Sequence, residues 1–385
     1  MTESRKSQAS PADGQTSPAD AIEQIGELSD PHVALSPSVA KSRSAGRRVV
    51  ELLYSYSVLW ALIGEVVIFS LLRPGTFFTT TNADSILSSQ AILLLVALGL
   101  TIPLAVDEFD LSIGAMVGFA EVILGTLTVN HHWALLPAIV VTLILAGLVG
   151  LINGMLIVRV GVGAFITTLA TGTILIGIGV KITNGSPITG VPQALVSLAS
   201  NSFLGIELVF WYAVGATIIL WYVLSHTPVG RWLYFTGANR EAARFNGIAV
   251  NRVRAGAFVA SALISGVAGI LYTGVFATAD PSTAQDQFLL PAFAACFLGA
   301  TAVTPGRFNA IGTFIAVYLV VTGVQGLSLV TNQVGWISFV FNGGILVLAV
   351  VVQRSVAKRR QRQAASLRTQ RTSLPPERLS SATSD

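Results

Sequence analysis

The sequence predicts an all-α membrane protein that crosses the bilayer about ten times. Only 11% of its 385 residues are charged and 52% are hydrophobic, whereas a typical soluble domain carries about 25% charged residues. The deficit is confined to residues 50–353. Apolar runs recur there at about 20 residues each, the length needed to cross a hydrocarbon layer about 30 Å thick. One water-soluble core does not account for such runs.

Both ends of the chain differ from this apolar middle. Residues 1–48 are rich in Ser, Ala, Pro and Asp and lack the apolar stretch of a signal peptide. Residues 356–385 are basic and rich in Ser and Gln. We therefore expect a disordered N-terminal tail, a membrane domain at 49–355 and a disordered basic C-terminal tail. A polar loop at 226–254 interrupts the membrane domain.

Ten apolar segments are predicted to span the membrane. Their approximate bounds are 53–73, 86–106, 111–129, 134–158, 163–183, 207–225, 254–277, 288–303, 309–330 and 334–353.

The basic residues predict the orientation of these spans, because Lys and Arg favour the cytoplasmic side. Four basic residues lie at 41–48, before the first span, and four more at 354–360, after the last. Both termini are therefore predicted to be cytoplasmic, which requires an even number of spans. The basic residues inside the domain agree with a count of ten spans. Arg159 follows the fourth span, the arginines of 231–254 follow the sixth, and Arg307 follows the eighth. Because residues 74–158 contain no Lys or Arg, eight or nine spans with a re-entrant segment stay possible.

An acidic turn separates the second and third spans. Asp107, Glu108 and Asp110 lie between two apolar runs and have no basic neighbour in the sequence. If the turn lies at the surface, the acids are solvated and Asp110 caps the third span. If it lies at membrane depth, the acids need protein or water around them and belong to a transport pathway.

The segment Thr236–Ile248 is a polar, helix-forming insert in this apolar chain. Asn239 is a suitable N-cap, Glu241 lies in the first turn, and Gly247 is placed to end the helix. Two interpretations are open. The helix either docks a soluble partner or lies on the lipid surface, with Arg240 and its neighbour one turn later close to headgroups.

No pattern in the chain predicts catalysis or a metal site. The sequence contains no Gly-Lys dipeptide and therefore no phosphate-binding loop of the G-x(4)-G-K-[ST] form. Its four histidines and single cysteine show no ligand spacing for a metal. The net charge of +4 comes largely from the ends and one loop, so it concerns topology rather than nucleic-acid binding. We expect no bound cofactor, and any ATP hydrolysis that powers the protein must occur on another chain.

Several short motifs occur in an order that resembles a known family, over residues 75–353. They are Asp110-Leu-Ser-Ile-Gly114, Asn153-Gly154, Ala164-Phe-Ile-Thr-Thr-Leu169, Thr183-Asn-Gly-Ser-Pro187, Gly230-Arg231, Gly237-x-Asn239, Ala242-Ala243 and Gly247-Ile248. With them the chain resembles the inner-membrane permease subunits of bacterial ABC sugar importers, in the ribose and xylose permease group. Leu289-Leu-Pro291 departs from the Glu-Leu-Asp run that many members of that group carry, which leaves the individual sugar open.

The resemblance implies a set of partners and a location. A separate cytoplasmic ABC ATPase would bind ATP and Mg²⁺, and an extracytoplasmic sugar-binding protein would deliver the substrate. A second permease subunit, identical or a paralogue, would complete the pore in the bacterial inner membrane.

The resemblance also implies a role for the polar insert, which would be the coupling helix that fits a cleft on the ATPase. The coupling residues are then Gly237, Asn239, Glu241, Ala242, Ala243, Phe245 and Gly247. As a substrate pathway we expect Asp110, Ser112, Glu121, Asn153, Phe165 and Thr168.

Two other functions stay open at this point. One is an ABC permease for branched-chain amino acids or nucleosides. The other is an ion-coupled secondary carrier, a class that often has broken helices around a site at the membrane midplane. In such a carrier, Asp110 and Glu121 would bind the cation.

Overall fold

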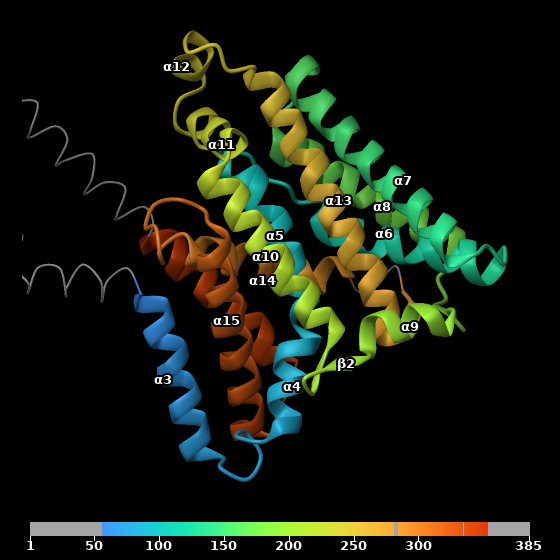
Figure 1. Ribbon diagram of the computed structural model, residues 1–385, viewed down its shortest axis with the longest axis vertical. Helices are drawn as coiled ribbons and strands as arrows, with labels where there is room; N and C mark the ends of the chain where they lie inside the picture. The colour runs from blue at the N-terminus through green and yellow to red at the C-terminus, as the bar shows by residue number, and fades with distance from the viewer. Residues whose placement is uncertain (1–55, 281–283, 334, 353–385) are drawn as a thin grey trace, which may run out of the picture. The chain divides into compact units, whose positions relative to one another are not determined.

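The computed structural model describes residues 56–280, 284–333 and 335–352, and it is built almost entirely from α-helices (Figure 1). The tails predicted at 1–48 and 356–385 lie outside the described residues. The helices are α3 (Ser57–Leu72), α4 (Thr80–Ser89), α5 (Ala91–Ala105), α6 (Ile113–Gly125), α7 (Leu135–Met155), α8 (Ala164–Thr183), α9 (Gln193–Ser200), α10 (Leu208–His226), α11 (Pro228–Ala238), α12 (Arg240–Phe245), α13 (Val250–Phe276), α14 (Ala284–Gly299), α15 (Ala310–Thr331) and a final helix Trp336–Val352.

Two π-helical turns and two short strand pairs occur between the helices. Two π-helical turns, η1 (Thr126–Asn130) and η2 (Leu156–Val160), extend α6 and α7. Two antiparallel strand pairs follow: β1 (Ile188–Thr189) with β4 (Thr278–Ala279), and β2 (Ser202–Phe203) with β3 (Ile206–Glu207).

The predicted all-α polytopic fold is confirmed. Within the described residues, seven helices are long and apolar enough to span a membrane, and three of them cover the stretch 74–158 in which basic residues gave no orientation. The first and tenth predicted spans correspond to the shorter apolar helices α3 and Trp336–Val352, and the eighth overlaps the short helix α14. A helix of α14's 16 residues rises about 24 Å, less than the hydrocarbon thickness.

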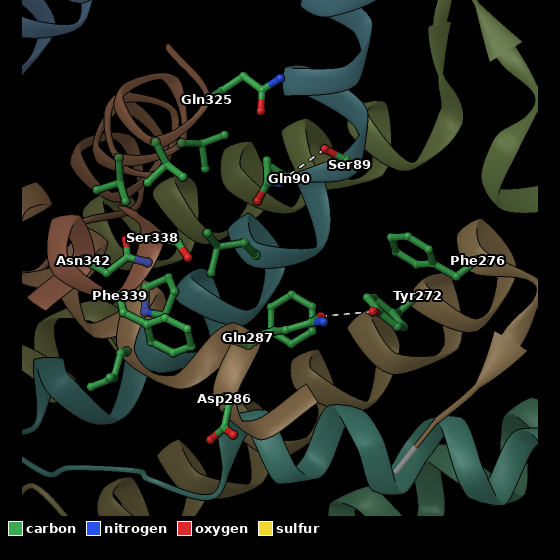
Figure 2. Close-up of a pocket in the computed structure, with 17 residues that line it drawn as sticks. Ser89, Gln90, Tyr272, Phe276, Asp286, Gln287, Gln325, Ser338, Phe339 and Asn342 are labelled. Atoms are coloured by element: carbon green, nitrogen blue, oxygen red, sulfur yellow. Dashed lines mark hydrogen bonds between the residues drawn. The ribbon is translucent and has the colours of Figure 1, made fainter. Parts of the chain in front are cut away.

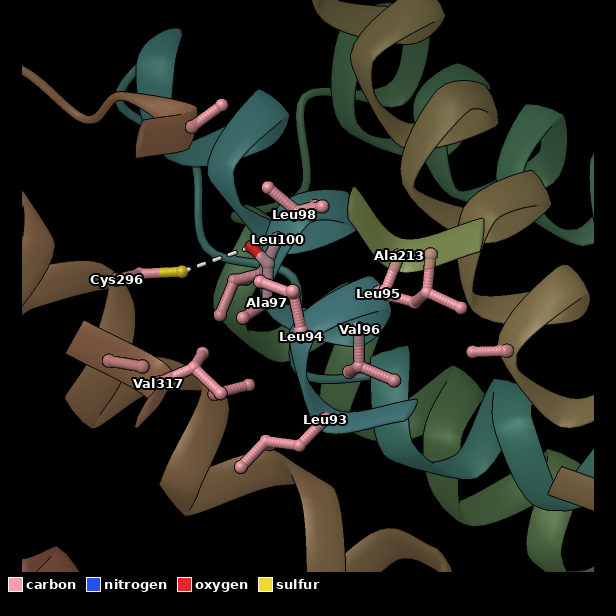
Figure 3. Packing of buried hydrophobic residues seen from close by; sticks show 14 of the residues in the cluster. Leu93, Leu94, Leu95, Val96, Ala97, Leu98, Leu100, Ala213, Cys296 and Val317 are labelled. Atoms are coloured by element: carbon pink, nitrogen blue, oxygen red, sulfur yellow. Dashed lines mark hydrogen bonds between the residues drawn. The ribbon is translucent and has the colours of Figure 1, made fainter. Parts of the chain in front are cut away.

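The core of the membrane domain surrounds α5, in which every residue is buried. A helix that is apolar on all sides is stable only when neighbours cover all of it. α10, α13, α14 and α15 supply that cover. Figure 3 shows the middle of this cluster, where the Cys296 thiol donates to the carbonyl oxygen of Ala97 at 3.1 Å.

The contact between α7 and α13 depends on small residues. A Cβ atom on Gly150 would come within 2.6 Å of the Phe258 carbonyl oxygen and 2.8 Å of the Val259 Cα. Ala146 lies against Gly266 in the same interface. Small residues allow helix backbones to approach closely in lipid, where van der Waals packing drives their association.

This packing yields a prediction. Gly150→Ala should destabilise the protein by about 1–3 kcal/mol, because the clashing atoms belong to the backbone of α13 and cannot rotate away. Gly177→Ala on α8 is the matched control, since nothing lies within 4 Å of its added Cβ. Thermal unfolding of the purified protein measures both, and equal melting temperatures for the two variants would contradict the packing argument.

Candidate functional site

The polar insert forms the short helix that its sequence predicts. α12 is capped by Asn239, whose Oδ1 accepts a hydrogen bond from the Ala242 backbone N–H at 2.9 Å. Gly247 follows the helix with φ of +78°, a conformation that suits glycine. The preceding helix α11 begins at Pro228 and is capped by Thr227. α11 and α12 together form the polar loop between α10 and α13 (Figure 1).

The predicted coupling residues occupy two faces of this loop. Gly237 and Ala243 face the rest of the chain: a Cβ on Gly237 would lie 2.3 Å from the Ala105 carbonyl oxygen, and Ala243 is fully buried. Glu241, Ala242 and Phe245 are exposed. The Phe245 ring is the most exposed large apolar side chain in the described residues, at 90%. One face of the loop is therefore anchored, and the other presents an aromatic ring.

The acidic turn lies directly beneath α12 and is held by two arginines. Glu108 Oε1 accepts hydrogen bonds from Arg240 Nη2 of α12 at 2.8 Å and from Arg254 Nε of α13 at 2.7 Å. The Glu108 side chain is only 6% exposed, so this carboxylate is paired inside the protein. The expectation that the acids are simply solvated is wrong for Glu108 and Asp110, which are both buried, and holds only for Asp107. The arginine partners of Glu108 come from distant parts of the sequence.

Asp110 is the centre of a second buried group. Its Oδ1 accepts from the backbone N–H and the hydroxyl of Ser112, at 3.0 and 2.6 Å, and its Oδ2 accepts from the Ser261 hydroxyl at 2.9 Å. Asp110 is not the N-cap of α6, because Ser112 holds that position. Ser261 lies seven residues beyond Arg254 on α13, about 10 Å further along the helix. The turn therefore runs from the end of α5 into the interior.

Helices α7 and α8 contribute further polar side chains to the group around Asp110. Asn153 Nδ2 donates to the Ser112 hydroxyl at 3.2 Å, and Asn153 Oδ1 accepts from Thr171 at 2.6 Å. The Thr168 hydroxyl accepts from the Leu111 backbone N–H at 2.9 Å. Each of these polar groups has a partner, as buried polar groups in a membrane domain require.

Of the six predicted pathway residues, the structure brings four together and leaves two apart. The four are Asp110, Ser112, Asn153 and Thr168. Glu121 lies elsewhere on α6, where its Oε2 accepts from the Asp280 backbone N–H at 3.2 Å. Phe165 is more than half exposed on α8. Whether substrate passes any of them stays a prediction.

Sequence reasoning missed Ser261 and Thr171 in the Asp110 group, as well as the arginine partners of Glu108. Ser261 and Thr171 are two of several Ser and Thr residues in their spans, and no spacing connects them to the turn. It also missed a cavity of about 350 Å³ at another part of the membrane domain (Figure 2). None of the six predicted pathway residues lines that cavity.

The ion pairs of Glu108 yield a second prediction. Arg254→Ala should cost about 3 kcal/mol or more, because it removes a 13%-exposed partner from a buried carboxylate. Arg240→Ala should cost about 1 kcal/mol or less, because Arg240 is 40% exposed and Arg254 stays in place. Thermal unfolding measures both. In a Glu108→Gln background the cost of Arg254→Ala should fall, and an unchanged cost would contradict the pairing.

Comparisons with known proteins identify the family of the chain. The family model described as "Branched-chain amino acid transport system / permease component" matches residues 82–350. The ribose import permease protein of Bacillus subtilis is 34% identical over 291 residues, which cover 75% of this chain and 89% of that protein. The L-arabinose ABC transporter permease protein of Azospirillum brasilense is 30% identical over 319 residues, covering 80% and 92%.

Another relative is the ribose import permease protein of Haemophilus influenzae, which is 31% identical over 264 residues, 68% of this chain and 81% of that protein. No solved structure matches the chain. With a family model across most of the membrane domain and relatives matched over nearly their whole length, the chain belongs to the family of ABC-importer permeases that includes these ribose and L-arabinose permeases.

Proposed function

We propose that this chain is the membrane-spanning subunit of an ATP-driven importer that moves a ribose- or xylose-like monosaccharide into the cell. The names of its relatives support a sugar as substrate. The observation that carries the proposal is α12, a short capped helix that is anchored on one face and presents the exposed ring of Phe245 on the other. The chain has no phosphate-binding loop, so ATP hydrolysis on a partner chain would act on it through a contact of this kind.

The partners follow from this role. A cytoplasmic ABC ATPase with ATP and Mg²⁺ binds the face of Glu241, Ala242 and Phe245, and an extracytoplasmic sugar-binding protein delivers the substrate. A second permease subunit, identical or a paralogue, completes the pore. The protein lies in the bacterial inner membrane with both termini in the cytoplasm, and the arginines of residues 231–254 support that orientation.

The mechanism begins when ATP binding brings the two ATPase subunits together and displaces α12. Because α12 is connected directly to α11 and α13, the displacement reaches α10 and α13 along the chain. It also reaches the acidic turn through space, since Arg240 holds Glu108. Helices on the two sides of the pathway then change their relative positions, which switches access from the outer face to the cytoplasm.

A mutation in α12 tests the coupling contact. Phe245→Ala should lower sugar-stimulated ATP hydrolysis by the reconstituted complex about tenfold or more, because a large aromatic ring at the centre of a small contact contributes strongly to binding. Leu136→Ala on α7, which is also highly exposed, is the control and should leave the rate unchanged. Full coupled hydrolysis in Phe245→Ala would refute the assignment of α12.

A transport assay separates the proposal from its alternatives. In vesicles that hold the permease, the ATPase and the binding protein, ATP depletion should abolish sugar uptake, and collapse of the ion gradient should leave it intact. The reverse result would establish an ion-coupled carrier. The structure favours the first outcome, because Asp110 and Glu121 sit in separate environments and do not form a shared cation site. Uptake of L-leucine or uridine in place of a sugar would identify the other permease classes.

A further inference from the structure

Figure 2 shows the residues that line the cavity of about 350 Å³, which contacts the end of α13 opposite to α12. α13 starts beside α12 at Val250 and ends at Phe276, a rise of about 40 Å for its 27 residues. Tyr272 and Phe276, in the last turns of α13, line the cavity. With α12 on the cytoplasmic side, the cavity belongs to the outer half of the membrane domain. The first turns of α14 and of the final helix also border it.

The lining combines apolar side chains with several polar ones from different helices. Asp286 and Gln287 are exposed in the first turn of α14, although the second half of that helix is buried in the core. Gln90 and Gln325 approach the same space from α5's N-cap and from α15. Charged and amide groups at membrane depth require water or a ligand. The cavity therefore offers polar groups to water or to a ligand.

One lining residue points to a ligand independently of the cavity's shape. Asn342, on the final helix, is only 9% exposed, and its Oδ1 has no hydrogen-bond partner among the described residues. A buried amide oxygen without a partner costs about 1–3 kcal/mol. Figure 2 shows Asn342 beside Ser338 and Phe339 at the cavity wall. A hydroxyl group of a molecule in the cavity would donate a hydrogen bond to this oxygen.

The chemistry of the lining selects the class of that molecule. The side-chain amides of Gln90, Gln287, Gln325 and Asn342 each contain both donors and acceptors, so they match hydroxyl groups, which also do both. Tyr272 donates its hydroxyl to Gln287 Oε1 at 3.0 Å, which positions that amide. Tyr272 and three phenylalanines supply apolar faces for the C–H surface of a ring: Phe276, Phe288 and Phe339.

Charge excludes other classes of ligand. Asp286 is the single charged residue that lines the cavity in the described part of the chain, and it is acidic. A carboxylate or phosphate ligand would meet this acid with no arginine or lysine to bind it. A free amino acid is therefore a poor match, while an uncharged, hydroxyl-rich molecule fits. The volume lies at the lower end of the range for small-molecule sites, about 300–1,000 Å³.

We propose that this cavity, between α13, α14, α15 and the final helix, is a binding site for a neutral polyhydroxylated ligand of monosaccharide size, held by Asn342, Gln287 and Gln325. The proposal rests on the function proposed above and assigns the substrate class to a place in the chain. The site faces the outer side, so it receives the sugar before the helices switch.

A thiol reporter tests the site in the full chain. Cys296, the native cysteine, is fully buried, so a membrane-impermeant maleimide should not label it. Ser338→Cys places a reactive thiol at the cavity wall, and Ser197→Cys places one on the outer helix α9, away from the cavity. D-ribose or D-xylose should slow labelling of Ser338→Cys and leave labelling of Ser197→Cys unchanged. L-leucine, uridine and NaCl are the comparison probes.

Matched substitutions then test the named contacts. Asn342→Leu and Gln287→Leu keep side-chain size and remove the amides. Each should raise the sugar concentration for half-protection about tenfold. Thr142→Val is the control, because its hydroxyl bonds to Ala138 within α7, outside the cavity. It should leave half-protection unchanged. Equal protection in all three variants would overturn the assignment of these amides.

The remaining outcomes separate this site from the proposed function. Absence of protection by either sugar overturns the site, and protection by L-leucine, uridine or sodium alone overturns its ligand class. Either result is compatible with ATP-dependent uptake in the vesicle assay, which tests the function separately. Sugar protection without ATP-dependent uptake supports the site and refutes the ATP-driven mechanism.

Discussion

The structure depends on the neutralisation of one buried carboxylate, Glu108. A charged group at this depth is expensive unless it is paired and hydrogen-bonded. Arg254 from α13 and Arg240 from α12 both bind the same oxygen atom. This shared contact fixes the end of α5, the start of α13 and the exposed helix α12 in one geometry. Without it, Glu108 would be a buried charge without a partner, and α12 would lose its ion pair to the turn.

The long helices and α12 were predictable because each carries a local signal, whereas α4, α9 and α11 were not predicted. Runs of about 20 apolar residues define the spans, and the bounds of α12 follow from the cap at Asn239 and the terminating Gly247. The acidic turn shows where local reasoning ends. Glu108 and Arg240 are 132 residues apart, and no periodicity links them. The sequence also suggested Asp110 as a pathway residue. It could not show that the hydroxyl groups of Ser112 and Ser261 donate hydrogen bonds to the Asp110 carboxylate.

The cavity could not be predicted from the sequence, because six helices that are far apart in the chain contribute residues to it. One clue was present, however. The stretch Leu289-Leu-Pro291, where this chain departs from the pattern of the permeases it resembles, supplies Leu290 and Pro291 to the cavity wall. The departure therefore falls where ligand choice would be set, while the motifs shared with those permeases lie mainly around the turn and the polar loop. Pro291 also removes a backbone hydrogen bond from α14, which weakens that helix next to the cavity.

Phe109 lies between the two buried acids Glu108 and Asp110, and its ring adds a third contact to the acidic turn. Its ring stacks on Phe293 and Phe297 of α14, with ring centroids 6.1 and 6.4 Å apart. Three consecutive residues thus contact α12 and α13, α14, and the centre of α13. Adjacent Cα atoms stay 3.8 Å apart whatever the conformation, so these contacts cannot shift independently. One short turn therefore joins α12, α13 and α14, and a movement of any one of these helices relative to the others must be accommodated within three residues.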